Sequence, residues 1–312
     1  MTRIEPTPAI ERVLVVGAGA MGSQIAMVCA LAGLEVAVQD VAEATLAGAR
    51  AELDRRTTRS VAKGRLSASD QLAAMARLRF GTDLETLGAD ADLVIEAVVE
   101  KLDVKRELFA RLDRIAPKHA VLASNSSSFV PSRIAEATGR PDRVCNLHFF
   151  NPALVMRCVE VVRGPATSDA TVALVVDLTR RIGKVPVLVE KEIPGFIANR
   201  ILNAVRDEAI GLLEGGYAGI EAIDTVCRTA LGYPMGPFEL MDLTGIDIGC
   251  LTKQARFAET GDPKDAPSAS VTALVEAGRL GRKTGWGWYR YDEHGNRDEH
   301  RNRDEHGNTL EG

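Results

Sequence analysis

A glycine-rich segment directly after a short apolar run constrains the fold of this chain more than any other feature. The run at residues 13–16 leads into Gly17-Ala18-Gly19-Ala20-Met21-Gly22, and a helical pattern at 23–32 follows at once. In the order strand, G-x-G-x-x-G, helix, the first glycine permits a tight turn, the second lets the backbone approach a pyrophosphate, and the third lets the helix pack closely. Free N–H groups at the helix start then attract the anion. All six residues are therefore predicted to bind a dinucleotide.

Asp40 supplies the second part of the same fingerprint. An apolar run at 34–39 ends at this residue, about 20 residues past the glycines, where the motif places an acidic residue. A carboxylate there accepts hydrogen bonds from ribose hydroxyls and repels a 2′-phosphate, and Val41 and Ala42 offer no arginine for one. The predicted cofactor is NAD rather than NADP. Taken alone, Asp40 could equally be a turn residue or a helix N-cap.

Strand and helix patterns alternate through the first half of the chain. Further apolar runs expected to be strands lie at 93–99, 120–123, 144–150, 155–162 and 185–189, and helical patterns between them lie at 101–115, 131–138 and 169–182. Strands separated by helices predict an α/β fold with a doubly wound, mostly parallel sheet of the Rossmann type. We expect this NAD-binding domain to span residues 1–190.

Residues 43–76 are too many for one crossover helix. We interpret them as a helical pair broken near Lys63-Gly64-Arg65, with Ser67 as a candidate cap of the second helix. Such an appendage would lie outside the sheet, where it can cover a bound ligand.

The pattern changes after residue 190. Helical patterns cover 194–213, 220–231, 238–258 and 270–276, with no strand-length run between them. Residues 191–290 therefore predict a second, all-helical domain. The first of these helices carries a wide apolar stripe, which can serve either the domain core or a dimer face.

The end of the chain is of another kind. The segment Arg-Asp-Glu-His-Arg-Asn at 297–302 is nearly repeated at 303–308, and such a sequence cannot bury a core. We expect a disordered charged tail over 291–312. Three of the five histidines lie in it, but we predict no metal site.

Composition excludes several classes of protein. Of the 312 residues 46% are hydrophobic, and a net charge of −5 gives no reason to expect a nucleic-acid partner. The five cysteines lack C-x-x-C or metal-ligand spacing, which favours thiols in a reducing compartment. No apolar run approaches the ~20 residues that span a bilayer, and residues 1–9 do not resemble a secretory signal. We expect a cytoplasmic protein with no membrane partner.

His148 is the predicted general base. It lies near the end of the strand predicted at 144–150, and ligands of such sheets bind beyond the carboxyl ends of the strands. Hydride transfer from an alcohol needs a base for the hydroxyl proton, and histidine has a suitable ordinary pKa. A buried structural histidine is the alternative. His119, in a polar turn, is expected to be a solvated loop residue.

Glu160 is the predicted partner of His148. If the strands at 144–150 and 155–162 form a hairpin turning near Ala153-Leu154, the two side chains lie opposite each other. A carboxylate in an otherwise apolar strand is costly unless it is paired. A histidine pair explains it, because the carboxylate fixes the tautomer and stabilises the imidazolium.

A run of serines follows another predicted strand at the same edge of the sheet. It reads Ser-Asn-Ser-Ser-Ser at 124–128. Its hydroxyls can hydrogen-bond a substrate oxygen, and helix capping ahead of Pro131 is the alternative for some of them.

Six motifs occur in an order and at spacings that together are highly specific. They are the serine run, His-Phe-Phe-Asn-Pro at 148–152, Val-Glu-Val-Val at 159–162, Pro-Gly-Phe-Ile-Ala-Asn-Arg at 194–200, Gly-Tyr-Pro-Met-Gly-Pro-Phe-Glu at 232–239 and Gly-Arg-Lys-Thr-Gly at 281–285. They resemble the L-3-hydroxyacyl-CoA dehydrogenases, and most closely the short branch that includes 3-hydroxybutyryl-CoA dehydrogenases. The resemblance covers residues 13–289. It implies NAD-dependent oxidation of an (S)-3-hydroxyacyl-CoA to the 3-oxoacyl-CoA, and a homodimer through the helical domain.

The resemblance also implies roles for single residues. His148 is the base and Glu160 its partner, while Ser127 and Asn199 hydrogen-bond the C3 oxygen of the substrate. Read from the residues alone, Asn199 is a polar residue on a helix at a domain boundary.

Further positions match the family's cofactor contacts. They are Glu100, Lys105, Asn151 and Lys283. The alternatives are an exposed ion pair for Glu100 and Lys105, a turn residue for Asn151 and a helix C-terminal charge for Lys283.

Residues 43–76 correspond to the family's acyl-CoA contact region. Thr57 and Lys63 are the candidates for the CoA phosphates, although Lys63 can equally belong to a solvated face. Trp286 and Trp288 depart from the family pattern, which leaves the chain-length preference open.

Two other functions compete with this prediction. One is a related dehydrogenase of a small free hydroxy acid, such as a sugar acid or carnitine, but such relatives lack counterparts of Phe149, Phe150 and Met156. The other is a cofactor-binding protein without activity, since a fold alone does not prove an activity. Loss of a catalytic position would favour it, and all four are present.

Overall fold

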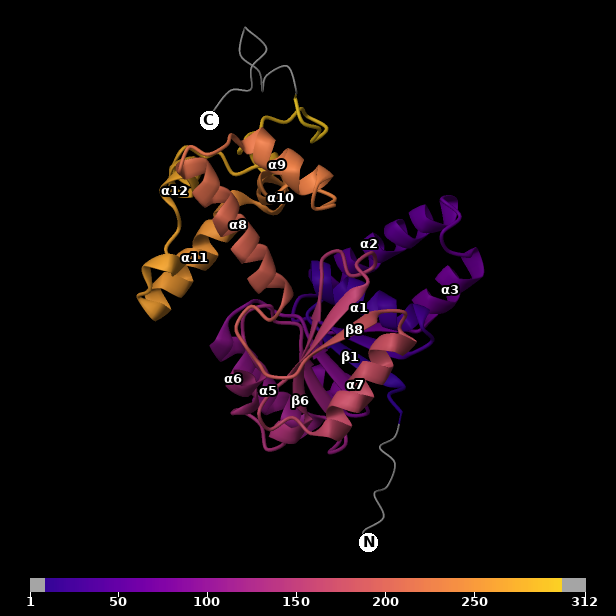
Figure 1. Cartoon of the computed structure of the whole chain (residues 1–312). Helices are drawn as coiled ribbons and strands as arrows, with labels where there is room; N and C mark the ends of the chain where they lie inside the picture. The colour runs from indigo at the N-terminus through magenta and orange to yellow at the C-terminus, as the bar shows by residue number, and fades with distance from the viewer. Residues whose placement is uncertain (1–8, 299–312) are drawn as a thin grey trace. The chain divides into compact units, whose positions relative to one another are not determined.

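The computed structural model describes residues 9–298, and the chain divides between Asn199 and Arg200 into two compact units. The first unit holds an eight-stranded sheet with helices on both faces, and the second is built of helices (Figure 1). The sequence places the boundary near residue 190. The residues after it stay with the sheet because the buried ring of Phe196 packs with Val162 and Val189.

The sheet is mostly parallel and doubly wound, as predicted. Its strands are β1 (Arg12–Val16), β2 (Glu35–Gln39), β3 (Leu78–Gly81), β4 (Leu93–Glu96), β5 (Val121–Ser124), β6 (Val144–Phe149), β7 (Cys158–Arg163) and β8 (Val185–Val189), in the order 3-2-1-4-5-6-7-8. Every neighbouring pair is parallel except β6 and β7, which are antiparallel. The strand order reverses between β1 and β4, and ligands of such sheets bind in the crevice at that point.

Two apolar clusters cover the faces of the sheet. Alternate residues of β1 divide between them, since Val13 and Val15 belong to one cluster and Leu14 and Val16 to the other. The first cluster packs against α1 (Ala20–Leu31), α2 (Glu43–Ala62), α3 (Ala68–Ala76) and α7 (Asp169–Arg181). The second packs against α4 (Leu84–Gly88), α5 (Leu102–Ile115) and α6 (Pro131–Ala135).

The predicted helical appendage is α2 and α3, which extend outward from the sheet in Figure 1. Gly64 turns the chain between them with a φ of 65°. The predicted cap is confirmed, because the Ser67 hydroxyl accepts a hydrogen bond of 3.0 Å from the Asp70 N–H. Leu46 and Leu53 of α2 are buried in the sheet cluster and anchor the pair.

The prediction omitted β3 and α4. β3 has only four residues, lies at the edge of the sheet and has one buried residue, Leu78. α4 has five residues and begins at the cap Asp83. Neither element is long enough to show a clear hydrophobic period.

The second unit contains α8 (Ala198–Glu214, starting at the end of the first unit), α9 (Ile220–Thr229), α10 (Pro237–Thr244), α11 (Ile246–Thr260) and α12 (Ala269–Glu276). A single helix over 238–258 is wrong, because Gly245 ends α10 with a φ of 97°. Phe238, Met241 and Tyr289 lie in the unit's core. In the described part of the chain, no helix is long and apolar enough to cross a bilayer.

The segment after residue 290 differs from the predicted tail as far as 298. Tyr291 is buried and its hydroxyl donates to Asp242, while Arg297 bonds Glu221. Arg297 belongs to the repeat of charged residues, and Tyr291 lies six residues before it, so neither anchor is evident from the sequence. Residues 299–312, with His300 and His306, lie outside the described part.

Candidate active site

The glycine loop has the predicted geometry. Gly17 has a φ of 99°, and its N–H donates to the Gln39 carbonyl at 2.7 Å. A Cβ on Gly22 would lie 1.8 Å from the Gly17 carbonyl oxygen, so the helix start packs directly on the loop. A Cβ on Gly19 would meet no protein atom within 4 Å. The loop is therefore closed on the protein side and open at Gly19, as an approaching pyrophosphate requires.

Asp40 lies beside this loop. One carboxylate oxygen accepts a hydrogen bond of 2.9 Å from the Ala18 N–H, and the other accepts one of 3.1 Å from the Ala42 N–H. Asp40 is thus a turn residue, and its carboxylate also fixes the glycine loop. Its remaining lone pairs can accept from ribose hydroxyls, so the loop and Asp40 fit NAD.

His148 and Glu160 meet as predicted. They face each other across β6 and β7, with His148 Nδ1 2.8 Å from a Glu160 carboxylate oxygen. The histidine is 6% exposed and the glutamate 1%. The other Glu160 oxygen accepts from the N–H groups of Ile197 at 2.9 Å and Ala198 at 2.8 Å. The rings of Phe150 and Phe196 lie 4.6 Å and 5.6 Å from the imidazole.

The environment of Glu160 favours its ionised form. Burial alone would raise the pKa of this carboxyl, but the hydrogen bonds from His148 and from the backbone of Ala198 and Ile197 outweigh it and hold the pKa below its usual value. The imidazole therefore faces a carboxylate through Nδ1. Its Nε2 is left for another partner.

The serine run forms a loop after β5 that is tied to its neighbours. Ser124 and Ser126 are buried and bond Glu96 and Glu100 respectively. The Asn125 side chain accepts from the Phe149 N–H at 2.9 Å, which joins the loop to the strand of His148. The Ser126 hydroxyl accepts from the N–H groups of Ser128 and Phe129 and so closes a turn within this loop. It does not cap a helix, because the N-cap of α6 is Val130 and no side chain caps it. Ser127 is half-buried on the same loop.

Glu100 and Lys105 are not an exposed surface pair. The Lys105 side chain is 1% exposed, and its ammonium lies 2.6 Å from Glu96 and 3.1 Å from Glu100. The lysine is buried because these two carboxylates neutralise it. Its predicted contact with the cofactor would compete with both bonds. Glu100 is more exposed and stays a candidate.

Other predicted residues lie in three places. Asn151 is exposed after β6, and Asn199 follows Ala198 at the start of α8. Lys283 lies in the second unit, where its ammonium is 2.6 Å from both oxygens of Asp247. Lys283 lies in a three-residue 3-10 helix, Arg282–Thr284, and is one of the basic residues of its last turn.

The two CoA candidates have different surroundings. Thr57 is 3% exposed, donates to the Leu53 carbonyl and accepts from Gln71. It joins α2 to α3 and is poorly placed for a phosphate. Lys63 is exposed at the end of α2. His119 keeps 38% of its side chain exposed in its loop, and its Nε2 also lies 3.0 Å from Asp92.

Comparisons with known proteins agree with this geometry. The model of the 3-hydroxyacyl-CoA dehydrogenase NAD binding domain matches residues 12–193, and that of the family's C-terminal domain matches 195–291. The chain belongs to the 3-hydroxyacyl-CoA dehydrogenase family. As a member of this family, it is an NAD-dependent oxidoreductase.

Three relatives show how far the similarity extends. Human mitochondrial hydroxyacyl-coenzyme A dehydrogenase is 42% identical over 90% of this chain and 91% of its own. The probable 3-hydroxybutyryl-CoA dehydrogenase of Bacillus subtilis is 41% identical over 91% of this chain and 98% of its own. The crystal structure of (S)-3-hydroxybutyryl-CoA dehydrogenase from Ralstonia eutropha is 38% identical, with a TM-score of 0.86 over 91% of this chain and all of that one.

Two family motifs of the second unit have a structural role. Asp224 accepts from the N–H groups of Phe238 and Glu239 at the start of α10, and Asp242 accepts from those of Trp288 and Tyr289. A Cβ on Gly236 would lie 2.2 Å from the Asp224 carboxyl, and one on Gly287 2.0 Å from that of Asp242. Gly236, in the motif at 232–239, and Gly287, two residues after the motif at 281–285, thus make room for two buried carboxylates.

Burial changes the ionisation of both carboxylates. It raises the pKa of Asp224 to about 6 and that of Asp242 above its usual value, although hydrogen bonds to each oppose the shift. The sequence prediction missed both residues, and it also missed Glu96. Glu96 lies in an apolar run like Glu160, so the argument that selected Glu160 applies to it as well.

Proposed function

We propose that this chain oxidises (S)-3-hydroxyacyl-CoA substrates of the 3-hydroxybutyryl-CoA kind to 3-oxoacyl-CoA, with His148 as general base. The observation that carries this proposal is the buried contact of 2.8 Å between His148 and Glu160 at the carboxyl end of β6. A histidine and a carboxylate paired at that edge of a doubly wound sheet can accept and release one proton beside a bound dinucleotide.

The imidazole receives the hydroxyl proton at Nε2. Its Nδ1–H donates to Glu160, which fixes the tautomer and stabilises the imidazolium that forms. The rings of Phe150 and Phe196 exclude water from the imidazole, which strengthens its interaction with the carboxylate. Ser127 and Asn199 are the proposed donors to the C3 oxygen.

The glycine loop and Asp40 hold NAD, which supplies the hydride acceptor when bound. Backbone N–H groups at the start of α1 would hold the pyrophosphate, and Asp40 would accept from the adenosine ribose. Glu100, Asn151 and Lys283 are proposed further contacts. Lys63, exposed at the end of α2, is the proposed contact to a CoA phosphate.

The substrate class is tested by NADH consumption with three kinds of 3-oxo substrate side by side. Acetoacetyl-CoA and longer 3-oxoacyl-CoAs are expected to be reduced, and free acetoacetate is not. Reduction of free acetoacetate at a comparable rate would favour the dehydrogenase of a small free hydroxy acid. NADH binding without turnover of any substrate would favour a non-catalytic protein.

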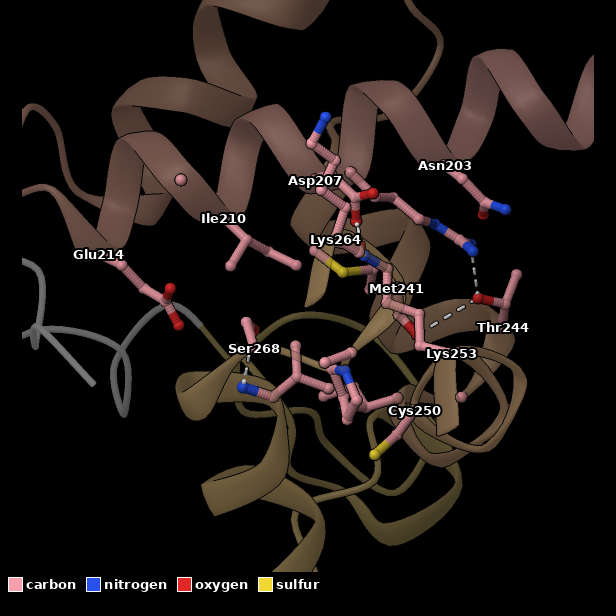
Figure 2. A pocket seen from close by; sticks show the side chains of 18 residues that line it. Asn203, Asp207, Ile210, Glu214, Met241, Thr244, Cys250, Lys253, Lys264 and Ser268 are labelled. Atoms are coloured by element: carbon pink, nitrogen blue, oxygen red, sulfur yellow. Dashed lines mark hydrogen bonds and ion pairs between the residues drawn. The ribbon is translucent and has the colours of Figure 1, made fainter. Parts of the chain in front are cut away.

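We propose that the protein is a homodimer formed through the second unit. Helices α8, α10 and α11 carry exposed apolar side chains, which are Ile201, Leu243, Ile248, Leu251 and Phe257. Figure 2 shows side chains of α8 facing those of α10 and α11 across a cavity of about 410 Å³. None of the five exposed apolar residues lines this cavity. Exposed apolar side chains on three helices of one unit favour burial against a second copy.

Sedimentation velocity tests the dimer. The wild type is expected at twice the chain mass, and Leu251→Glu at the chain mass, because a charge is costly in an apolar interface. Leu72→Glu, at an exposed leucine of α3, is the matched control and should stay dimeric. A wild-type monomer would refute the proposal.

We also propose a cytoplasmic location, supported by five cysteines that are all free thiols.

A further inference from the structure

Glu96 is a fully buried carboxylate that the proposed chemistry does not use. It ends β4 and is 0% exposed. In the sheet it pairs with Val16 of β1 on one side and with Ser124 of β5 on the other. The glycine loop follows β1 directly, and the serine loop follows β5. Glu96 therefore lies between the loop for the cofactor and the loop that carries Ser127.

Both oxygens of Glu96 accept strong hydrogen bonds. One accepts from the Lys105 ammonium at 2.6 Å and from the Val98 N–H at 2.7 Å. The other accepts from the Ser124 hydroxyl at 2.6 Å. Since Lys105 is itself 1% exposed, each of the two charges depends on the other for its burial.

Two chains of hydrogen bonds lead from Glu96 and meet at Ser126. The first runs through Lys105 to Glu100 at 3.1 Å, and Glu100 in turn accepts from the Ser126 hydroxyl and from the Ser128 N–H. The second runs through the Ser124 hydroxyl, which accepts from the Ser126 N–H at 3.1 Å. Ser127 lies between the two residues that Glu100 holds, so its backbone is fixed from both sides.

We propose that Glu96 is a positioning residue for the reaction proposed above, on which this inference rests. Through Ser124 it sets the place of Ser127, and through Lys105 it sets the place of Glu100. A single carboxylate thereby aligns a substrate contact and a cofactor contact. We call the chain through Ser124 the serine arm and the chain through Lys105 the lysine arm. The serine arm can be cut alone, whereas loss of the Glu96 charge affects both arms, so the two changes should have different kinetic effects.

The arms are tested with two variants and one control. Ser124→Ala removes only the serine arm, while Glu96→Gln removes the charge that both arms share. Glu107→Gln replaces an exposed carboxylate on the same helix as Lys105 and is the matched control. For each, we would measure the Kd for NADH by fluorescence titration, kcat with acetoacetyl-CoA per folded chain, and the melting temperature.

Ser124→Ala is expected to lower kcat about tenfold while the Kd for NADH changes less than twofold, because one hydrogen bond to a charged group is lost. Glu96→Gln is expected to lower kcat at least tenfold and also to raise the Kd for NADH about tenfold, because Lys105 then draws Glu100 out of place. Glu107→Gln should leave all three values unchanged.

A purely structural role predicts a different result. Both variants would then melt at a lower temperature but keep the wild-type kcat and Kd per folded chain, which would overturn the proposal. If Glu96→Gln does not fold, the kcat of Ser124→Ala decides alone. If the wild type does not turn over acetoacetyl-CoA, the proposed function fails. The Kd of Glu96→Gln then decides the positioning role, and a wild-type value would overturn it.

Discussion

At the scale of single residues, Glu160 connects the chemistry with the fold. Its carboxylate accepts from His148 and from the first N–H groups at the start of α8. These bonds hold its pKa below the ordinary value of 4.5 in spite of burial. A lowered carboxyl pKa contributes stability that is present above the unfolded-state pKa and is lost as the pH falls through the folded-state pKa. The contact between His148 and Glu160 and the start of α8 should therefore weaken together in acid.

Asp40 gives the first prediction. Replacing it by alanine removes the ribose acceptor, so the Kd for NADH should rise about tenfold or more, as for a hydrogen bond to a charged group. The KM for acetoacetyl-CoA should change by less than about twofold, since nothing places this substrate at Asp40. Isothermal titration with NADH and initial rates measure the two quantities. Equal weakening of both ligands would contradict the assignment of Asp40 to the cofactor.

The sequence predicts single residues well only where local geometry suffices. The pairing of His148 with Glu160 needs only the position of one hairpin turn, and the structure has that register. Lys105 was open to interpretation as a surface charge, because its burial depends on Glu96, and the sequence shows no sign that the two meet. Thr57 is similar, since its partner Gln71 belongs to the next helix.

At the scale of elements, the join between β1 and α1 gives the second prediction. Gly22→Ala would place a methyl group 1.8 Å from the Gly17 carbonyl oxygen, so the free energy of unfolding should fall, by about 1–3 kcal/mol as for other overpacked sites. Gly19→Ala is the matched variant, because its methyl group meets no protein atom within 4 Å. It should keep the stability but weaken NADH binding. Urea unfolding and NADH titration of both variants check this.

Two results would contradict this prediction. If Gly19→Ala binds NADH like the wild type, no ligand approaches the backbone there. If Gly22→Ala keeps the wild-type stability, α1 can move away from the loop without cost.

Element boundaries follow from the sequence where caps and long apolar runs mark them. Ser67 predicts the start of α3, and the central strands appear as apolar runs. β3 shows no such run, because the edge of the sheet buries only one of its four residues. The break between α10 and α11 depends on Gly245, whose positive φ can be known only from the packing around it.

At the scale of the whole molecule, Asp224 gives the third prediction. Its pKa of about 6 lies above the ordinary 3.8, so the folded chain binds a proton more tightly than the unfolded one. Its contribution to stability is therefore full below about pH 4 and is lost as the pH rises through 6. The difference of the two pKa values corresponds to an effect on the order of 3 kcal/mol.

Tryptophan fluorescence can follow this effect in the second unit alone, because both tryptophans of the chain, Trp286 and Trp288, belong to it. Between pH 4 and pH 7 the stability advantage of the wild type over Asp224→Asn in urea should shrink by that amount. Glu276→Gln, at an exposed carboxylate of α12, should show no such change. An advantage that grows with pH would contradict the account of Asp224.

The central claim is that one imidazole, held by Glu160, takes the substrate proton. The direct measurement is the kcat of His148→Gln with acetoacetyl-CoA and NADH, together with the Kd for NADH. We predict a loss of turnover of about 10²–10⁴-fold, the usual contribution of general acid–base catalysis, with an unchanged Kd. A variant that turns over at the wild-type rate would contradict the mechanism.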